Sequence, residues 1–141
     1  MDHSAKPDDE LKFFLFYREL RHAFPRINAM AVWQNVDLIG DGSSHYRILS
    51  EIGNELVKWM DQNEIAAALS LLDVLEATYV ESSIIRDPIY TDFVPALIAY
   101  DELEPRIKVK FMLKPALTEA YNRLLPFYGH PGRDQDQPST T

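Results

Sequence analysis

Residues 43–85, SSHYRILSEIGNELVKWMDQNEIAAALSLLDVLEATYVESSII, decide the fold of this chain, because they read as two helices joined by a short turn. Ser43 and Ser44 provide an N-cap for the first of these helices, which we expect to run to about Asp61. Its apolar stripe recurs at spacings of three and four residues and consists of Leu49, Ile52, Leu56, Trp59 and Met60.

The second helix of this stretch is expected from Glu64 to about Ile85, with Asn63 as its cap. It is apolar nearly all round. Its bulky stripe consists of Ile65, Leu69, Leu72, Leu75 and Tyr79, and most of the opposite residues are small. A helix with two apolar faces usually lies between neighbours. We therefore expect this helix to be the centre of the fold.

Toward the N-terminus, the acids at positions 8–10 and apolar residues at helical spacing predict a helix from Pro7 to Phe24, which Pro25 ends. Residues 26–43 are less regular. Within them, residues 29–38 fit either a short helix or an extended stretch, and Gly40-Asp41-Gly42 is a turn.

Toward the C-terminus, Asp87 as a cap and Pro88 as the first helical residue predict a fourth helix, which Pro95 weakens in its middle. A short helix is expected over 104–114 and a last one from Pro115 to about Pro126. From Gly129 the sequence is polar and lacks hydrophobic residues, which is typical of a disordered tail.

These elements predict an all-α fold: a single-domain bundle of five to six helices over residues 1–128, followed by a disordered tail over 129–141. The pairs 44–85 and 88–126 are expected to form consecutive antiparallel hairpins. With 141 residues, the chain is long enough to bury one hydrophobic core.

Charge is segregated along the sequence. Between Asp37 and Glu104, fourteen acidic residues stand against three basic ones, and residues 105–126 carry five basic residues and one acidic residue. In the basic stretch, Arg106, Lys110 and Lys114 are four residues apart, and we expect them to face the acidic middle and offset its repulsion. The net charge of −8 disfavours nucleic acid and favours a cationic partner, such as a basic protein.

The composition also limits the chemistry and the cellular location that we expect. There is no cysteine, so disulfide and thiolate chemistry are excluded. The first ten residues are polar and acidic, unlike a secretory signal, and no uncharged apolar run is long enough to cross a bilayer. We expect a cytoplasmic protein that does not enter a membrane.

Catalytic, metal and cofactor motifs were not found. The histidines His3, His22, His45 and His130 do not pair with each other or with a carboxylate at the spacing of a metal site. Arg123 and His130 have the Arg-x6-His spacing of the HEPN-type ribonucleases, which this chain resembles in being small and helical. A helical ribonuclease is therefore an alternative, as is a regulatory scaffold or a homodimeric module. The expectation is a protein that is not an enzyme and needs no cofactor.

The candidate partner-binding residues are acidic side chains grouped around one aromatic. Trp59 is close in sequence to Asp61 and Glu64, an arrangement suited to gripping a basic surface, although core packing is the other interpretation of this tryptophan. Glu51 and Glu55 lie one turn apart on the outward face, beside Arg47 and Lys58. The full candidate set is Glu51, Glu55, Trp59, Asp61, Glu64 and Asp73.

Parts of this chain resemble small, acidic, all-helical bacterial immunity proteins. The resembling segments are residues 46–57 (YRILSEIGNELV), 71–76 (LLDVLE) and 93–97 (FVPAL), and Lys114-Pro115 before a helix with Tyr121. The resemblance covers residues 44–126. It implies a binding protein that neutralises a cognate toxin domain by covering the cationic surface of its active site. It carries over no individual functional residue.

Overall fold

The computed structural model describes residues 7–35 and 43–128, and all the regular structure in these ranges is helical. The longest elements are α1 (Pro7–Ala23), α4 (Ser43–Asp61), α5 (Ile65–Glu81) and α8 (Pro115–Tyr128). Two short helices, α2 (Pro25–Asn28) and α3 (Val32–Asn35), follow α1. The all-α bundle with one hydrophobic core is thus confirmed. The predicted tail at 129–141 lies outside the described residues.

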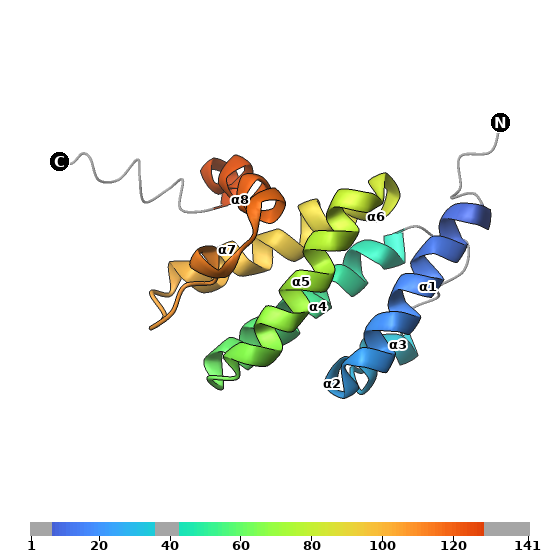
Figure 1. Cartoon of the computed structure of the whole chain (residues 1–141), viewed down its shortest axis with the longest axis horizontal. Helices are drawn as coiled ribbons and strands as arrows, with labels where there is room; N and C mark the ends of the chain where they lie inside the picture. The colour runs from blue at the N-terminus through green and yellow to red at the C-terminus, as the bar shows by residue number, and fades with distance from the viewer. Residues whose placement is uncertain (1–6, 36–42, 129–141) are drawn as a thin grey trace.

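In Figure 1, α4 and α5 lie together in the middle, with α1 on one side and α7 (Val94–Glu102) and α8 on the other. The central helix is α4, which packs against α5 and also against the long helix that ends in α7. The prediction that residues 64–85 form the centre is wrong. The outer face of α5 leaves Leu69, Asp73 and Val80 exposed, so this helix covers α4 rather than lying between two layers.

The α4–α5 turn is built differently from the prediction. Asn63 has a left-handed backbone (φ 64°) and ends α4, instead of capping α5. The N–H of Glu64 donates to the Trp59 carbonyl at 2.8 Å, and that of Asn63 to the Met60 carbonyl at 3.0 Å. These are the two bonds of a Schellman motif, in which asparagine tolerates the left-handed position.

The next helix begins earlier than predicted. α5 ends at Glu81, and Ser82 accepts the N–H of Ile85 at 3.1 Å to cap α6 (Ser83–Pro88). Asp87 and Pro88 are therefore inside a helix and do not begin one. The side chain of Arg86 donates to the carbonyls of Tyr79 (2.7 Å) and Val80 (3.0 Å), so it caps the end of α5 that Ser82 interrupts.

From α6 the chain continues through η1, a π-helical turn at Ile89–Phe93, into α7. The N–H of Val94 bonds to the carbonyl of Ile89, five residues back. In an α-helix the ring of Pro95 would clash with the carbonyl four residues earlier, and the wider turn relieves this clash. The prediction that Pro95 disturbs the middle of this helix is confirmed.

The predicted helix over 104–114 is wrong except for η2, a 3-10 turn at Val109–Met112. Asp101, only 4% exposed, organises this region. Its carboxylate accepts the N–H groups of Val109 (2.8 Å) and Lys110 (3.0 Å) and the hydroxyl of Tyr121 (2.8 Å). One buried carboxylate thus fixes η2 and joins α7 to α8.

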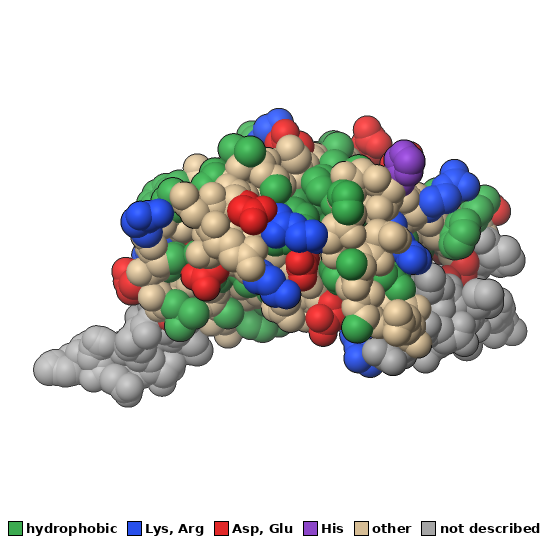
Figure 2. Space-filling view, turned by 90° about the horizontal axis from the view of Figure 1, so that it is seen from below, with side chains coloured by type: hydrophobic (Ala, Val, Ile, Leu, Met, Phe, Trp, Pro, Cys, Tyr) green, Lys and Arg blue, Asp and Glu red, His purple; other side chains and the backbone are tan. Residues whose placement is uncertain are grey.

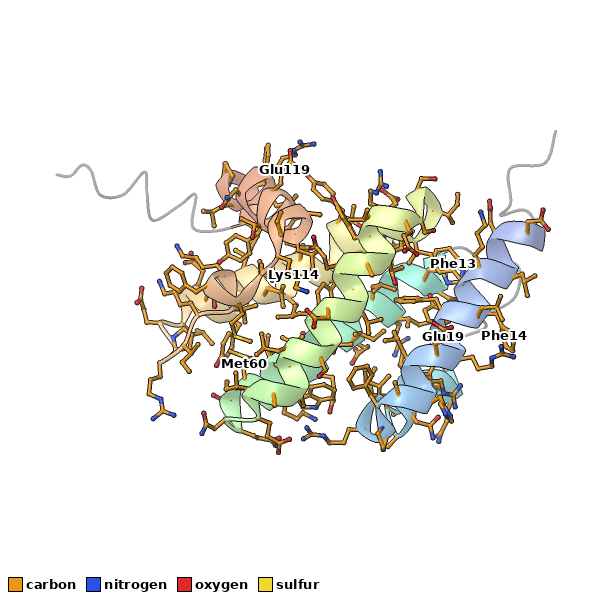
Figure 3. The ribbon with its side chains drawn as sticks, viewed as in Figure 1. Phe13, Phe14, Glu19, Met60, Lys114 and Glu119 are labelled. Atoms are coloured by element: carbon orange, nitrogen blue, oxygen red, sulfur yellow. The ribbon has the colours of Figure 1, made fainter. Side chains whose placement is uncertain are left out.

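A second buried polar network joins α1 to α4. His45 is stacked on Phe13, with ring centroids 3.6 Å apart, and its Nδ1 lies 2.7 Å from the hydroxyl of Tyr17. Its Nε2 is 3.2 Å from the carboxylate of Glu10. Tyr17 and Glu10 thus provide a hydrogen-bond partner for each ring nitrogen of His45. Figure 3 shows Phe13 on the inner side of α1 and Phe14 on the outer side.

At Gly53, α4 lies close to the η1–α7 helix. A Cβ atom at this position would lie 2.9 Å from Cβ of Ala96 and 3.1 Å from the carbonyl oxygen of Phe93. Both neighbours are on packed helices and have little freedom to move. Glycine is therefore required here by the approach of another helix and not by its own backbone angle.

We predict that Gly53→Ala lowers the free energy of unfolding by about 1–2 kcal/mol, since overpacking outweighs the roughly 1 kcal/mol gained in helix propensity. Asn54→Ala is the matched control, because Asn54 is the exposed neighbour on the same helix. Urea unfolding followed by circular dichroism measures both. A stabilised Gly53→Ala variant would contradict the close crossing.

Candidate functional site

Two of the six sequence-predicted residues, Glu51 and Glu55, line a groove on the outer side of α4. This hollow of about 510 Å³, here called the α4 groove, lies between α4 and the segment that joins α2 to α3. Its charged and polar lining consists of Arg26, Arg47, Glu51, Asn54, Glu55 and Lys58. Three cations and two carboxylates therefore share the groove. It is a mixed surface and not an acidic one.

Trp59 is a core residue. Its side chain is 1% exposed, and its indole N–H donates to Glu55 Oε2 at 2.9 Å. The guanidinium carbon of Arg26 lies 4.6 Å from the centre of the Trp59 ring. The interpretation of this tryptophan as an exposed anchor is therefore wrong. The stripe at helical spacing that placed it with Leu56 and Met60 predicted its position correctly.

Two of the predicted carboxylates near this tryptophan already have partners within the protein. Glu55 accepts the indole N–H and lies 3.4 Å from Nζ of Lys58. Glu64 forms an ion pair with Arg26, which also donates to Gln62 at 3.2 Å. Arg26 thereby links α2 to the α4–α5 turn. These carboxylates support the fold and are poorly placed to receive a partner's cations.

The other three predicted carboxylates are separated from one another. Glu51 is exposed in the α4 groove and has no hydrogen-bond or ion-pair partner among the described residues. Asp61 is exposed at the end of α4. Asp73 lies on α5, 3.1 Å from Nζ of Lys114. Figure 3 shows Lys114 between α5 and α8. The six candidates therefore do not form one site.

The negative charge of the middle segment is partly used inside the molecule. Glu76 caps α8 by accepting the N–H groups of Ala116 and Leu117, both at 2.9 Å. Of the three cations expected to offset this charge, Lys114 does so by pairing with Asp73. Arg106 instead donates to Asn63 Oδ1 at 3.5 Å, and Lys110 lies over the ring of Phe111. On the face in Figure 2, acidic and basic side chains are interspersed. That face has no continuous acidic field.

An exposed aromatic among carboxylates does exist, at a place that the sequence did not indicate. Tyr46 is 37% exposed, and its hydroxyl donates to Asp87 Oδ2 at 2.6 Å. Asp92 is close enough to act on this hydroxyl electrostatically. We call Tyr46, Asp87 and Asp92 the acidic patch. The sequence could not reveal it, because α4 and α6 meet here across 41 residues.

The hydrogen bond to Asp87, with burial and the charges of Asp87 and Asp92, raises the pKa of Tyr46 to about 12. The folded protein therefore holds this proton more tightly than the unfolded chain, whose tyrosines ionise near pH 10. This contribution to stability is complete below pH 10 and is lost as the pH rises from 10 to about 12.

We expect Asp87→Asn to lower the pKa of Tyr46 toward its ordinary value, and Asp73→Asn to leave it unchanged. The titration is followed by carbon NMR of the tyrosine Cζ atoms, with Tyr46→Phe to assign the signal. Ionisation of Tyr46 at pH 10 in the unmodified protein would show that the bond to Asp87 is absent in solution.

The catalytic alternative gains little from the geometry. Arg123 is paired with Glu119 at 3.0 Å, one turn away on α8, and His130 lies outside the described residues. No cluster of three or more potential metal ligands occurs in residues 7–35 and 43–128. Within the same ranges, no helix has both the length and the apolar character needed to cross a membrane.

Comparisons of this chain with protein-family models, curated proteins and solved structures gave no match.

Proposed function

We propose that the chain is a non-enzymatic binding protein that recognises a cationic protein surface. In the specific form of this proposal, it is an immunity protein that neutralises a cognate bacterial toxin by covering the basic surface of its active site. The main support is the acidic patch, where an exposed tyrosine donates a hydrogen bond to Asp87 and lies within electrostatic reach of Asp92.

The carboxylates of the acidic patch have no ion-pair partner among the described residues. Asp87 accepts from the hydroxyl of Tyr46, and Asp92 Oδ1 accepts from the hydroxyl of Thr91 at 2.7 Å. Both donors are neutral, so neither carboxylate is compensated by them. A lysine or arginine of a partner could bond to the remaining oxygen lone pairs, and such charge-assisted bonds are stronger than neutral ones.

The tyrosine ring contributes apolar contact area beside these charges. Tyrosine and arginine are enriched among the residues that dominate binding energy at interfaces, and they often contact one another. Because Tyr46 is fixed by its bond to Asp87, little side-chain entropy would be lost on binding. The net charge of −8 would also accelerate encounter with a basic partner, and salt would weaken this effect.

The test purifies the full chain together with the product of the adjacent gene. We expect a stable complex, rescue of growth, and binding that weakens with salt. Asp87→Asn combined with Asp92→Asn should weaken binding by at least about tenfold, whereas Asp73→Asn, on another helix, should have little effect.

Calorimetric titration measures these affinities, and thermal unfolding verifies that each variant is folded. Absence of a complex and of rescue would overturn the proposed function. Unchanged binding by the double variant would reject the acidic patch as the contact surface. Mixed RNA incubated with the pure protein should remain intact, since a binding protein does not cleave it.

A further inference from the structure

A hollow lined by basic side chains lies on the outer side of α1, on a different surface from the acidic patch. Its volume is about 480 Å³, within the range of small-molecule sites. We call it the cationic pocket, and its lining consists of Phe14, Tyr17, Arg18, Arg21, His22, Pro25 and Asn28. No carboxylate belongs to this lining. Four other hollows on the described part of the chain, one of them the α4 groove, each include at least one carboxylate.

Arg21 is held in a fixed position. Its Nε–H donates to Asn28 Oδ1 at 2.8 Å, and its guanidinium carbon lies 4.7 Å from the centre of the Trp33 ring. Trp33 is itself anchored, because its indole N–H donates to the Ile27 carbonyl at 2.7 Å. This support leaves the two terminal nitrogens of Arg21 without a hydrogen-bond partner among the described residues.

The terminal nitrogens of one guanidinium can bond two oxygens of a carboxylate or phosphate in parallel. Arg18, three residues earlier and exposed, has no partner in the described part of the chain and adds a second guanidinium. Because Arg21 is ordered beforehand, less conformational entropy is lost when an anion binds. The pocket therefore offers a preformed anion site with a second, adaptable cation.

An apolar wall completes the pocket. Phe14 is 52% exposed, and Figure 3 shows it on the outer side of α1, away from the core. Pro25 is exposed and supplies further apolar surface. A bare inorganic anion would leave this surface unused, whereas a ring attached to the anionic group would cover it.

The dipole of α1 explains only part of this arrangement. Arg21 and His22 lie in the last turn, where cations are stabilised by the helix dipole. That effect does not require the Asn28 and Trp33 contacts that orient Arg21. It also does not account for an exposed phenylalanine one turn before Arg18.

We propose that the cationic pocket binds a small organic anion, in which a phosphate or carboxylate is carried on an aromatic ring. The anionic group pairs with Arg21 and Arg18, and the ring lies against Phe14 and Pro25. This inference concerns a different surface from the acidic patch and does not depend on the proposed function.

The test is an NMR titration of the isotope-labelled full chain with four probes. Phenyl phosphate and benzoate carry both ring and charge, inorganic phosphate carries charge alone, and benzyl alcohol carries a ring alone. Saturable shifts confined to α1 and α2 are expected with phenyl phosphate or benzoate, and the tighter of the two identifies the anionic group. Inorganic phosphate should bind at least about tenfold more weakly, because it leaves the apolar wall exposed.

Arg21→Gln should weaken binding by about tenfold or more, and Arg21→Lys should also weaken it, because an ammonium cannot form the paired bonds. Arg123→Gln, on α8, is the matched control and should bind normally. If Arg21→Gln does not fold, Arg18→Gln replaces it. Absence of saturable shifts at millimolar phenyl phosphate, equal binding of inorganic phosphate, or unchanged binding by the arginine variants would overturn the proposal.

Discussion

Asp101→Ala is expected to lower the free energy of unfolding by about 3 kcal/mol, because three donors lose one buried acceptor. The N–H of Val109 and the hydroxyl of Tyr121 are buried and would have no water to replace the carboxylate. Burial and the bond to Asp101 also raise the pKa of Tyr121, as expected for a hydroxyl held beside a carboxylate away from solvent. Because these bonds position η2 and α8, their loss should loosen this whole end of the bundle.

Urea unfolding followed by circular dichroism measures the effect. Asp101→Asn keeps the shape of the side chain but turns an N–H₂ group toward a donor, and we expect an intermediate loss of about 1–2 kcal/mol. Asp61→Asn changes an exposed carboxylate and should alter stability by less than about 0.5 kcal/mol. A similar stability of the Asp101 and Asp61 variants would show that Asp101 is hydrated and does not organise this region.

Trp59→Ala is expected to lower the free energy of unfolding by about 3–5 kcal/mol, the range found when a large aromatic is removed from a core. Its ring fills the end of α4 beside Phe24, with ring centroids 5.9 Å apart, and supports the guanidinium of Arg26. Glu55 would lose its indole donor at the same time. Loss of this side chain should therefore weaken the junction of α1, α2 and α4.

Trp59→Phe separates the contribution of apolar packing from that of the indole hydrogen bond. It keeps most of the apolar volume and removes the N–H group, so a loss of about 1–2 kcal/mol is expected. Unfolding is best followed by circular dichroism. Trp33 would be the one tryptophan left in the variant, so its fluorescence would report on a different region from that of the unmodified protein. Trp59→Ala with unchanged stability but weaker binding to a basic partner would restore the interpretation of Trp59 as a surface anchor.

Local sequence patterns predicted the longer helices well. α1 begins at the predicted Pro7 and ends at Ala23, one residue before the prediction, and α4 ends at the predicted Asp61. Ser43, which was expected to cap α4, is instead its first helical residue. These bounds could be predicted because prolines and apolar spacing act within one helix. α8 also begins at the predicted Pro115. The α5–α6 boundary failed because two signals competed, and Ser82 capped the helix where Asp87 and Pro88 were expected to do so. The side chain of Arg86 stabilises this boundary by donating hydrogen bonds to carbonyls near the end of α5.

The candidate site was less predictable than the fold. Trp59 could be assigned to the core from its helical spacing, yet its nearness in sequence to acidic residues suggested a surface role. The contact between Tyr46 and Asp87 could not be predicted, because it depends on how α6 crosses the beginning of α4. The same holds for the cationic pocket, where Arg21 is fixed by Asn28 and Trp33 from the segment after α1.

By itself, the sequence determined that this protein is an all-α bundle with a large excess of acidic residues, because helical period and net charge are properties of neighbouring residues. Only the tertiary structure decided which carboxylates cap helices, which pair with cations and which face solvent. The physical reason is that a charge acts on whatever lies within a few ångströms of it. For Glu76, Asp101 and Asp87, the partners that lie this close belong to other helices or turns.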